Sequence, residues 1–207
     1  MDLKIASLNV RGLGNNTKRR EAFNWLRAKK KSIYMLKEVH CSEDTPNIWA
    51  SEWGYKALFS CCCSNKAGVS ILFNNNFNFQ IHKVFSDPNG RFLICDIVTN
   101  SKCLTVANIY APNEDDPNFF QVFFDHLSSF KCEEIIIGGD FNLVLNVGSD
   151  KRGGLARTQK NPLKVIQNFS ENLGLSDVWR IINPEARRYV ASKPACHTLP
   201  ARFFFSY

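Results

Sequence analysis

The stretch EEIIIGGDFN, residues 133–142, decides the fold that this sequence predicts. Its three consecutive isoleucines indicate a strand that is buried on both faces. Gly138 and Gly139 then let the backbone turn at the end of the strand and leave room for a ligand to approach. Asp140 and Asn142 follow, at a position where proteins of alternating strands and helices often build their sites. On this stretch alone, an Asx-type turn with a solvated Asp140 explains the pattern equally well.

Size and charge favour a single globular domain with an anionic partner. The chain has 207 residues, 44% of them hydrophobic, and a formal net charge of +7. Its basic residues gather in residues 18–31 and 151–164, which suits a nucleic-acid backbone, although solvated helix faces are the alternative. No apolar run approaches a membrane span, and no signal peptide is apparent. We therefore expect a soluble protein that is not associated with a membrane.

The eight cysteines are spaced in a way that predicts neither disulfides nor zinc. Three are consecutive at residues 61–63, and the others form no C-x-x-C pair. Cys95 and Cys103 stand in apolar, strand-like runs, where a free cysteine behaves as a small hydrophobic residue. The expectation is a reduced, intracellular protein.

The order of patterned segments predicts a layered α/β sandwich of two mixed, mainly antiparallel sheets flanked by helices. A helix capped by Asn16 or Thr17 is expected first. The expected strands are residues 3–10, 33–39, 55–63, 67–73, 77–85, 91–99, 102–110 and 133–137, and the expected helices are residues 17–31, 46–53, 117–130 and 161–173. From residue 183 onward the pattern is weak.

Several of these strands end in polar residues that a core would not favour. They are Asn9, Glu38 and the pair Asp140 and Asn142, and another strand ends at Tyr110. Oxygen ligands of this kind suit Mg²⁺, around which water could split a phosphodiester. Each residue also has a plainer explanation: Asn9 as a turn residue, Glu38 as a salt-bridge partner and Tyr110 as a core aromatic.

The same segments resemble a known family. Residues 7–13 (SLNVRGL), 36–40 (LKEVH), 108–113 (NIYAPN) and 138–142 (GGDFN) resemble four motifs of the endonuclease/exonuclease/phosphatase family, which has a DNase I-like fold. The closest likeness is to the endonuclease domain of LINE-type non-LTR retrotransposons, of which residues 175–180 (LSDVWR) are also typical. The resemblance covers essentially the whole chain, so residues 1–207 are expected to form one such domain.

The resemblance implies a role for each motif residue. Asn9 and Glu38 would hold Mg²⁺, for which Mn²⁺ could substitute, and Tyr110 would approach the scissile phosphate. Asp140 and Asn142 would orient and activate the attacking water. In-line attack would leave a 3′-hydroxyl and a 5′-phosphate, and such a nick primes reverse transcription in retrotransposons.

The resemblance also implies partners. The expected partners are target DNA and a reverse transcriptase domain in the parent polyprotein, with action in the nucleus and no obligate protein partner evident. The basic residues expected to contact DNA are Arg11, Lys151 and Arg152.

The chain departs from the family pattern at several positions. Lys37 stands where a Gln usually precedes the metal-binding Glu, and Val190 replaces a Thr that is expected after Tyr189. Ala201-Arg202-Phe203-Phe204 is the nearest match to a Ser-Arg-Ile-Asp motif, so Phe204 stands in place of the Asp.

The C-terminal end departs most from the pattern. The resemblance implies a final strand and a closing Ser-Asp-His that the sequence does not reach, so we expect the domain to lack them, and His197 lies too early to substitute. Losing one acid–base or phosphate-contacting group costs roughly 10²–10⁴-fold in rate. We therefore expect an impaired enzyme with an exposed Phe203–Phe205 run. The alternatives are a catalytically dead remnant that still binds nucleic acid, and a phosphoesterase of the same fold that acts on a small phosphate ester.

Overall fold

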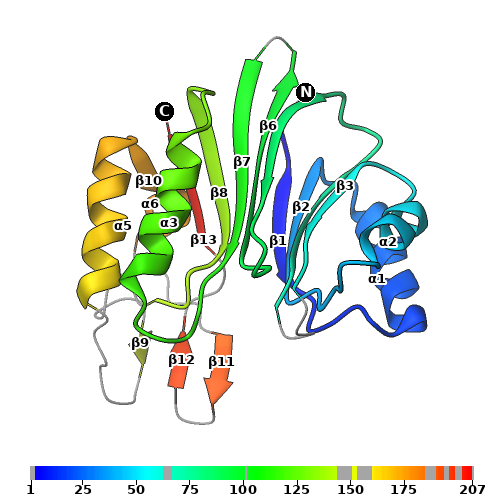
Figure 1. Cartoon of the computed structure of the whole chain (residues 1–207), viewed down its shortest axis with the longest axis horizontal. Coiled ribbons are helices and arrows are strands. Elements are labelled where there is room, and N and C mark those ends of the chain that lie inside the picture. Colours follow the sequence, from blue (N-terminus) through cyan, green and yellow to red (C-terminus); the bar gives the residue numbers. More distant parts are fainter. Residues whose placement is uncertain are drawn as a thin grey trace.

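Two β-sheets pack face to face at the centre of the molecule, with helices on both outer faces (Figure 1). The computed structural model describes residues 3–62, 67–100, 102–143, 151–152, 160–184, 190–193, 196–198 and 202–206. Both sheets contain parallel and antiparallel neighbours. The predicted layered α/β sandwich is therefore confirmed.

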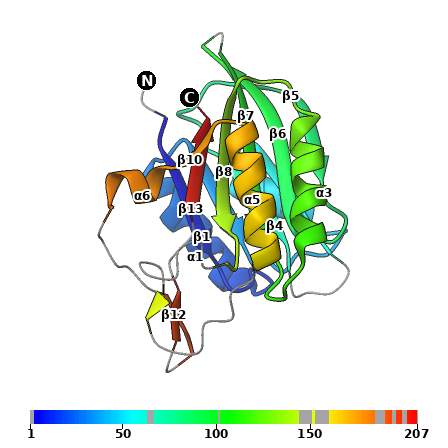
Figure 2. The same ribbon diagram turned by 90° about the vertical axis from the view of Figure 1, so that its left-hand side faces the viewer.

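The larger sheet has six strands, and β7 and β8 are its parallel pair. Helices α3 (Pro117–Ser128) and α5 (Lys160–Asn172) cover its outer face (Figures 1 and 2). The short helix α6 (Val178–Ile182) follows its edge strand. In spatial order the strands are β10 (Leu175–Asp177), β13 (Arg202–Ser206), β8 (Glu134–Asp140), β7 (Lys102–Tyr110), β6 (Phe92–Thr99) and β5 (Gln80–Ser86).

The smaller sheet has four strands and begins with the parallel pair β1 and β2. In spatial order they are β1 (Ile5–Asn9), β2 (Ile33–Lys37), β4 (Val69–Phe73) and β3 (Ala57–Ser60). Helices α1 (Asn16–Lys29) and α2 (Pro46–Trp53) pack on its outer face. A third, small sheet of β11 (Val190–Lys193), β12 (Cys196–Thr198) and β9 (Lys151–Arg152) lies beyond the ends of β7 and β8 (Figures 1 and 2).

The elements that were predicted agree with the observed ones apart from their ends, whereas β9 to β13 and α6 were not predicted. The helix at residues 46–53 and the strand at residues 102–110 have the predicted bounds. The strand expected at residues 55–63 is shorter, Ala57–Ser60. Helix α1 is capped by Asn15, whose side chain accepts a hydrogen bond from the Lys18 amide, so the predicted caps were one or two residues late.

Strand β8 is buried as predicted, but its glycines do not end it. Ile136 and Ile137 are buried, and the strand continues through Asp140. Gly139 has φ 144°, and a Cβ there would lie 2.0 Å from the Ile109 carbonyl oxygen in β7. The neighbouring strand therefore fills the space at Gly139, and the expectation that this space admits a ligand is wrong.

Strand β13 lies inside the large sheet, between β10 and β8. Phe204 is buried, and its ring packs against Phe141 with the centroids 5.1 Å apart. The expected exposed run at Phe203–Phe205 is therefore wrong at Phe204. The prediction failed because a short aromatic run does not show where its strand enters a sheet or which residues of the helices pack over it.

Two disulfides contradict the prediction from cysteine spacing. Cys41 bonds to Cys61, and Cys103 bonds to Cys132. The partners are 20 and 29 residues apart, and tertiary structure brings them together, which local spacing does not reveal. Cys95 is free and buried as expected, and burial raises the pKa of its thiol.

Candidate active site

Four strands end at one edge of the two sheets and place polar residues on the faces that meet. The parallel pairs β1–β2 and β7–β8 each present their carboxyl ends there. Side chains alternate between the two faces of a strand, and Ile5, Met35, Val106 and Ile136 of these strands lie in the core between the sheets, an even number of positions before the strand ends. The residues that continue this inner face to the edge are Asn9, Lys37, Tyr110 and Asp140.

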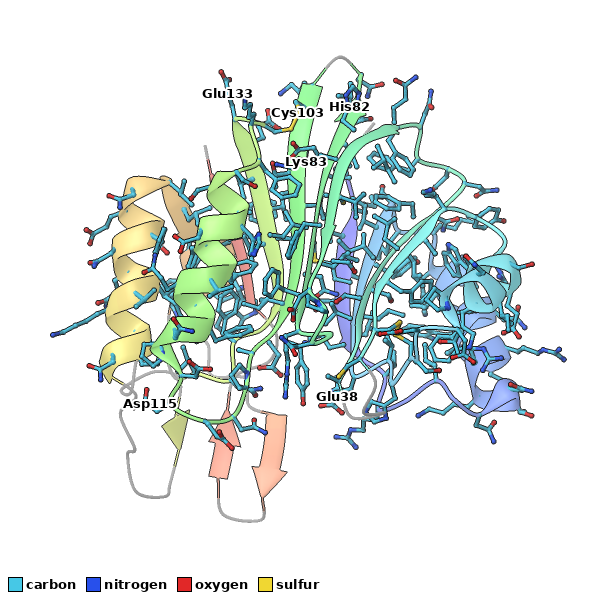
Figure 3. The ribbon with its side chains drawn as sticks, in the orientation of Figure 1. Glu38, His82, Lys83, Cys103, Asp115 and Glu133 are labelled. Atoms are coloured by element: carbon cyan, nitrogen blue, oxygen red, sulfur yellow. A yellow bond between two sulfur atoms is a disulfide. The ribbon has the colours of Figure 1, made fainter. Side chains whose placement is uncertain are left out.

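Glu38 follows β2 directly and joins the two sheets at this edge (Figure 3). Its Oε1 accepts a hydrogen bond from Asn9 Nδ2 at 2.6 Å and another from the Tyr110 hydroxyl at 3.0 Å. Asn9 belongs to the small sheet and Tyr110 to the large one. The structure therefore brings together three residues that the sequence proposed as parts of one site.

The backbone around Glu38 has an unusual conformation. Glu38 has φ 53° and His40 has φ 55°, values that non-glycine residues rarely adopt. The Gly12 amide donates to the Glu38 carbonyl at 2.6 Å, which ties the loop after β2 to the loop after β1. Arg11 and Asn142, each with φ 48°, also lie at this edge. Backbone strain persists where surrounding contacts enforce it, and it clusters at functional sites.

Asp140 and Asn142 form a turn at the end of β8. The Asn142 amide N–H donates to Asp140 Oδ1 at 3.1 Å, and Asn142 Nδ2 donates to the Ala111 carbonyl at 2.5 Å. The Asx-type turn proposed as the plainer explanation is therefore present. In the β7–β8 ladder Asp140 pairs with Tyr110, so the turn holds the carboxylate beside the phenol.

Tyr110 is a half-buried phenol in an acidic environment. Burial and the adjacent Glu38 carboxylate raise the pKa of Tyr110 to about 12, so its hydroxyl remains protonated at neutral pH. The Arg91 guanidinium carbon lies 5.2 Å from the centroid of the Tyr110 ring. The sequence pattern places Arg91 only at the start of an expected strand, although its position directly after the turn at residues 87–90 is a usable signal.

Lys37 adds a positive charge to this acidic edge. The residue is only 3% exposed, and burial lowers the pKa of its ammonium group. The charges of Asp140 and Glu38, in that order of strength, oppose the shift. Lys37 therefore interacts with both carboxylates of the site.

The chain matches the endonuclease/exonuclease/phosphatase family over residues 6–180. It belongs to that family. The match spans all of the residues described above at the carboxyl edge of the two sheets.

Solved structures support the fold. An AP endonuclease from Archaeoglobus fulgidus superposes with a TM-score of 0.77 at 18% identity, covering 99% of this chain and 87% of that one. The AP endonuclease LMAP from Leishmania major gives 0.76 at 15% identity, with 98% and 78% covered. The catalytic domain of Xenopus laevis APE2 gives 0.75 at 18% identity, with 98% and 82% covered. At these identities the likeness establishes a shared DNase I-like fold.

A curated relative is also found in sequence. It is the uncharacterized 149 kDa protein of transposon TX1 from Xenopus laevis, which is 27% identical over 188 residues. That alignment covers 89% of this chain but only 14% of the relative. The similarity therefore concerns one part of a much longer transposon protein.

The donor set of this family member fits a divalent cation. Mg²⁺ in proteins takes one or two carboxylates and keeps several waters, and Glu38 and Asp140 are the carboxylates available here. Asn9 supplies a neighbouring amide. In this structure its Oδ1 accepts from the Arg11 amide at 3.0 Å and its Nδ2 faces Glu38, so Asn9 positions the carboxylate. Within the described ranges, no group of three or more His, Cys, Asp and Glu residues is arranged to hold a metal.

The basic residues expected to contact DNA lie at the same end of the molecule. Arg11 is exposed beside Asn9, and its carbonyl accepts a hydrogen bond from Lys18 Nζ at 2.8 Å. Lys151 and Arg152 form β9 in the small third sheet, near the Glu38 end (Figures 1 and 3). Their side chains, and the whole of Tyr189, lie outside the described part of the chain. No helix in that described part is long and apolar enough to cross a bilayer.

Proposed function

We propose that this chain is a metal-dependent DNA endonuclease domain of retrotransposon origin that nicks DNA to leave a 3′-hydroxyl. The observation that carries the proposal is the contact between Glu38 and Tyr110, which assembles residues from both sheets at one edge beside Asp140. The family membership and the transposon relative support the reaction class and the DNA substrate. A reverse transcriptase domain in a parent polyprotein and action in the nucleus belong to the same proposal.

The residues have distinct proposed roles. Glu38, held by Asn9 Nδ2, binds Mg²⁺ or Mn²⁺, which when bound would neutralise charge that develops on the phosphate. Asp140, fixed by its hydrogen bond from the Asn142 amide, accepts a proton from the attacking water. The Tyr110 hydroxyl is protonated at neutral pH and can donate to a phosphate oxygen.

The surrounding cations are proposed to bind the DNA backbone. Arg91 lies over Tyr110 and Arg11 beside Asn9, so both can reach phosphates next to the scissile bond. Lys151 and Arg152 in the third sheet would extend this contact. Such contacts fix the position of the duplex without selecting its sequence.

We also propose that the activity of this chain is impaired. Lys37 stands buried at this edge, where the family pattern has a Gln, and its positive charge acts on Asp140 and Glu38, the carboxylates that would activate the water and bind the cation. The same observation supports the alternative function, a catalytically dead remnant that binds nucleic acid without cutting it.

The test is the relaxation of supercoiled plasmid in Mg²⁺ or in EDTA. We expect slow nicking in Mg²⁺ only, and Tyr110→Phe should reduce the rate by roughly 10²–10⁴-fold. Tyr55→Phe is the matched control, because Tyr55 lies before β3 and packs against Trp53, away from the site. DNA polymerase should extend the nicked product directly if it has a 3′-hydroxyl.

Other outcomes support the alternatives. Salt-dependent DNA binding without nicking in any metal would indicate a dead remnant. Release of phosphate from a small ester, with plasmid left intact, would indicate a phosphoesterase.

A further inference from the structure

Helix α1 and the two residues after it carry most of the positive charge of this chain. Residues 18–31 hold seven basic residues and one acidic residue, which gives a net charge of +6 where the whole chain has +7. Arg19 pairs with Glu52, and Arg27 donates to the backbone carbonyls of Glu52 and Trp53, so these two arginines are used inside the protein. Within the described part of the chain, no salt bridge involves the remaining five, which are Lys18, Arg20, Lys29, Lys30 and Lys31. A surface of like charges favours an anionic partner.

Trp25 stands exposed among these charges. It is 51% exposed, whereas Trp49 and Trp53 are buried. Lys29 Nζ lies 5.2 Å from the centroid of the Trp25 ring. Tryptophan is highly buried on average, so a half-exposed indole beside an ammonium group differs from an ordinary solvated helix face. An exposed aromatic ring among cations is the combination on which the unpaired bases of a single nucleic-acid strand stack.

Helical geometry places Trp25 in line with a lysine on either side of it. An α-helix turns about 100° per residue, so Lys18, Trp25 and Lys29 lie within about 40° of one another around α1. We call these three residues the α1 stripe. At about 1.5 Å per residue, the stripe is about 16 Å long. A DNA strand carries one phosphate per roughly 3.4 Å, so this length matches about five nucleotides.

The α1 stripe begins beside the candidate site and runs away from it. Lys18 Nζ donates to the Arg11 carbonyl at 2.8 Å, and the Arg11 amide donates to Asn9 Oδ1 at 3.0 Å. Strand β1 ends at the site, and β2 begins beside the opposite end of β1, because the two strands are parallel. Helix α1 joins these strands across the outer face of the small sheet, so it leads from the site toward the opposite end of that sheet (Figure 1).

We propose that the α1 stripe binds single-stranded DNA, with one base stacked on Trp25 and the neighbouring phosphates held by Lys18 and Lys29. The proposed function does not require this surface, because it assigns the contacts with the DNA backbone to Arg11, Arg91, Lys151 and Arg152. The α1 stripe adds a track along which an unpaired strand leaves the site. A duplex cannot use this track fully, since its bases are paired and stacked on one another.

The experiment measures the fluorescence anisotropy of a labelled oligothymidylate, in EDTA so that no strand is cut. Trp25→Ala should weaken binding by roughly 5- to 150-fold, the range that one stacked base is worth. Trp25→Phe keeps an aromatic face and should restore most of the affinity. Lys29→Gln should reduce the slope of log affinity against log salt by roughly 0.7, the value for one phosphate contact on a single strand.

Two variants elsewhere on the surface are the controls. Ile182→Ala shortens an apolar side chain that is 71% exposed, and it should leave the affinity for oligothymidylate unchanged. Lys102→Gln removes a lysine that is paired with Glu134 on the large sheet, and it should leave the salt dependence unchanged. The Trp25 variants change an exposed residue, so they should keep the urea unfolding curve of the natural chain.

Equal affinity of Trp25→Ala and the natural chain for oligothymidylate would overturn the inference. An equal loss for oligothymidylate and for the same strand in a duplex would also overturn it, since Trp25 would then not be reading unpaired bases. Binding to phosphatidylserine vesicles that depends on Trp25, without any effect of Trp25 on oligothymidylate, would indicate a membrane surface instead.

The proposed function can fail separately. A loss in Trp25→Ala that Trp25→Phe restores would support the α1 stripe even if the natural chain nicks no plasmid in Mg²⁺. Nicking by the natural chain, together with unchanged oligothymidylate binding in Trp25→Ala, would refute the α1 stripe and leave the proposed function standing.

Discussion

Replacing Gly139 with alanine should remove a large part of the folding free energy. Gly139 has φ 144°, and residues held in such sparsely populated regions are strained by roughly 1–3 kcal/mol. The new Cβ would also lie 2.0 Å from the Ile109 carbonyl oxygen and 2.8 Å from the Ile109 carbonyl carbon and amide nitrogen. These are backbone atoms of a paired strand, so they cannot rotate away. Forced packing of this kind costs roughly 1–3 kcal/mol more.

The expected loss for Gly139→Ala is therefore about 2–6 kcal/mol, against a typical stability of roughly 5–15 kcal/mol. Urea unfolding followed by tryptophan fluorescence measures it, since Trp53 is fully buried. Gly14→Ala is the matched control, because a Cβ at Gly14 meets no atom within 4 Å, and it should change stability by less than about 0.5 kcal/mol. A loss below about 1 kcal/mol in Gly139→Ala would contradict the close approach of β7 and β8 described above.

Three further predictions concern stability. Asn108→Ala removes two buried hydrogen bonds that cross between the sheets, to the carbonyls of Leu36 and Ser70, so urea unfolding should show a loss of about 1–3 kcal/mol. Burial lowers the pKa of Lys37 in the folded chain, so the unfolded chain binds this proton more tightly. The charged lysine therefore destabilises the fold at neutral pH, and this penalty shrinks as pH rises toward 10.5, the ordinary pKa of a lysine. The natural chain should therefore gain stability relative to Lys37→Met between pH 7 and 10, by at most about 1.4 kcal/mol per pH unit, and a flat difference would contradict the shift. Removing the Cys41–Cys61 disulfide, whose cysteines are 20 residues apart, by Cys41→Ala together with Cys61→Ala should cost about 3 kcal/mol, measured by urea unfolding of the variant and the natural chain without reductant.

Much of the fold could be predicted because its strands have clear local patterns. The isoleucines of β8 and the alternation in β7 are visible in sequence, and so are the proline and glycine that bound α2. The position of β13 could not be predicted, since pairing with β8 and β10 depends on residues 25 or more positions away. The two disulfides could not be predicted for the same reason, because tertiary structure brings their cysteines together.

The candidate site was predictable where a polar residue ends an apolar strand. Asn9, Glu38, Tyr110 and Asp140 all follow that rule, and their convergence follows from two pairs of parallel strands. The contacts of these residues were not predictable. The Glu38 backbone conformation depends on hydrogen bonds from the loop after β1, and the burial of Lys37 depends on the large sheet packing against the small one.

The most direct test of the account compares the natural chain with Asp140→Asn on supercoiled plasmid in saturating Mg²⁺. The substitution keeps the size of the side chain and an oxygen for the hydrogen bond from the Asn142 amide, but it removes the proton acceptor. We expect the natural chain to nick and Asp140→Asn to be slower by roughly 10²–10⁴-fold, with the same unfolding curve. Equal nicking by both proteins would show that this edge of the two sheets is not the active site.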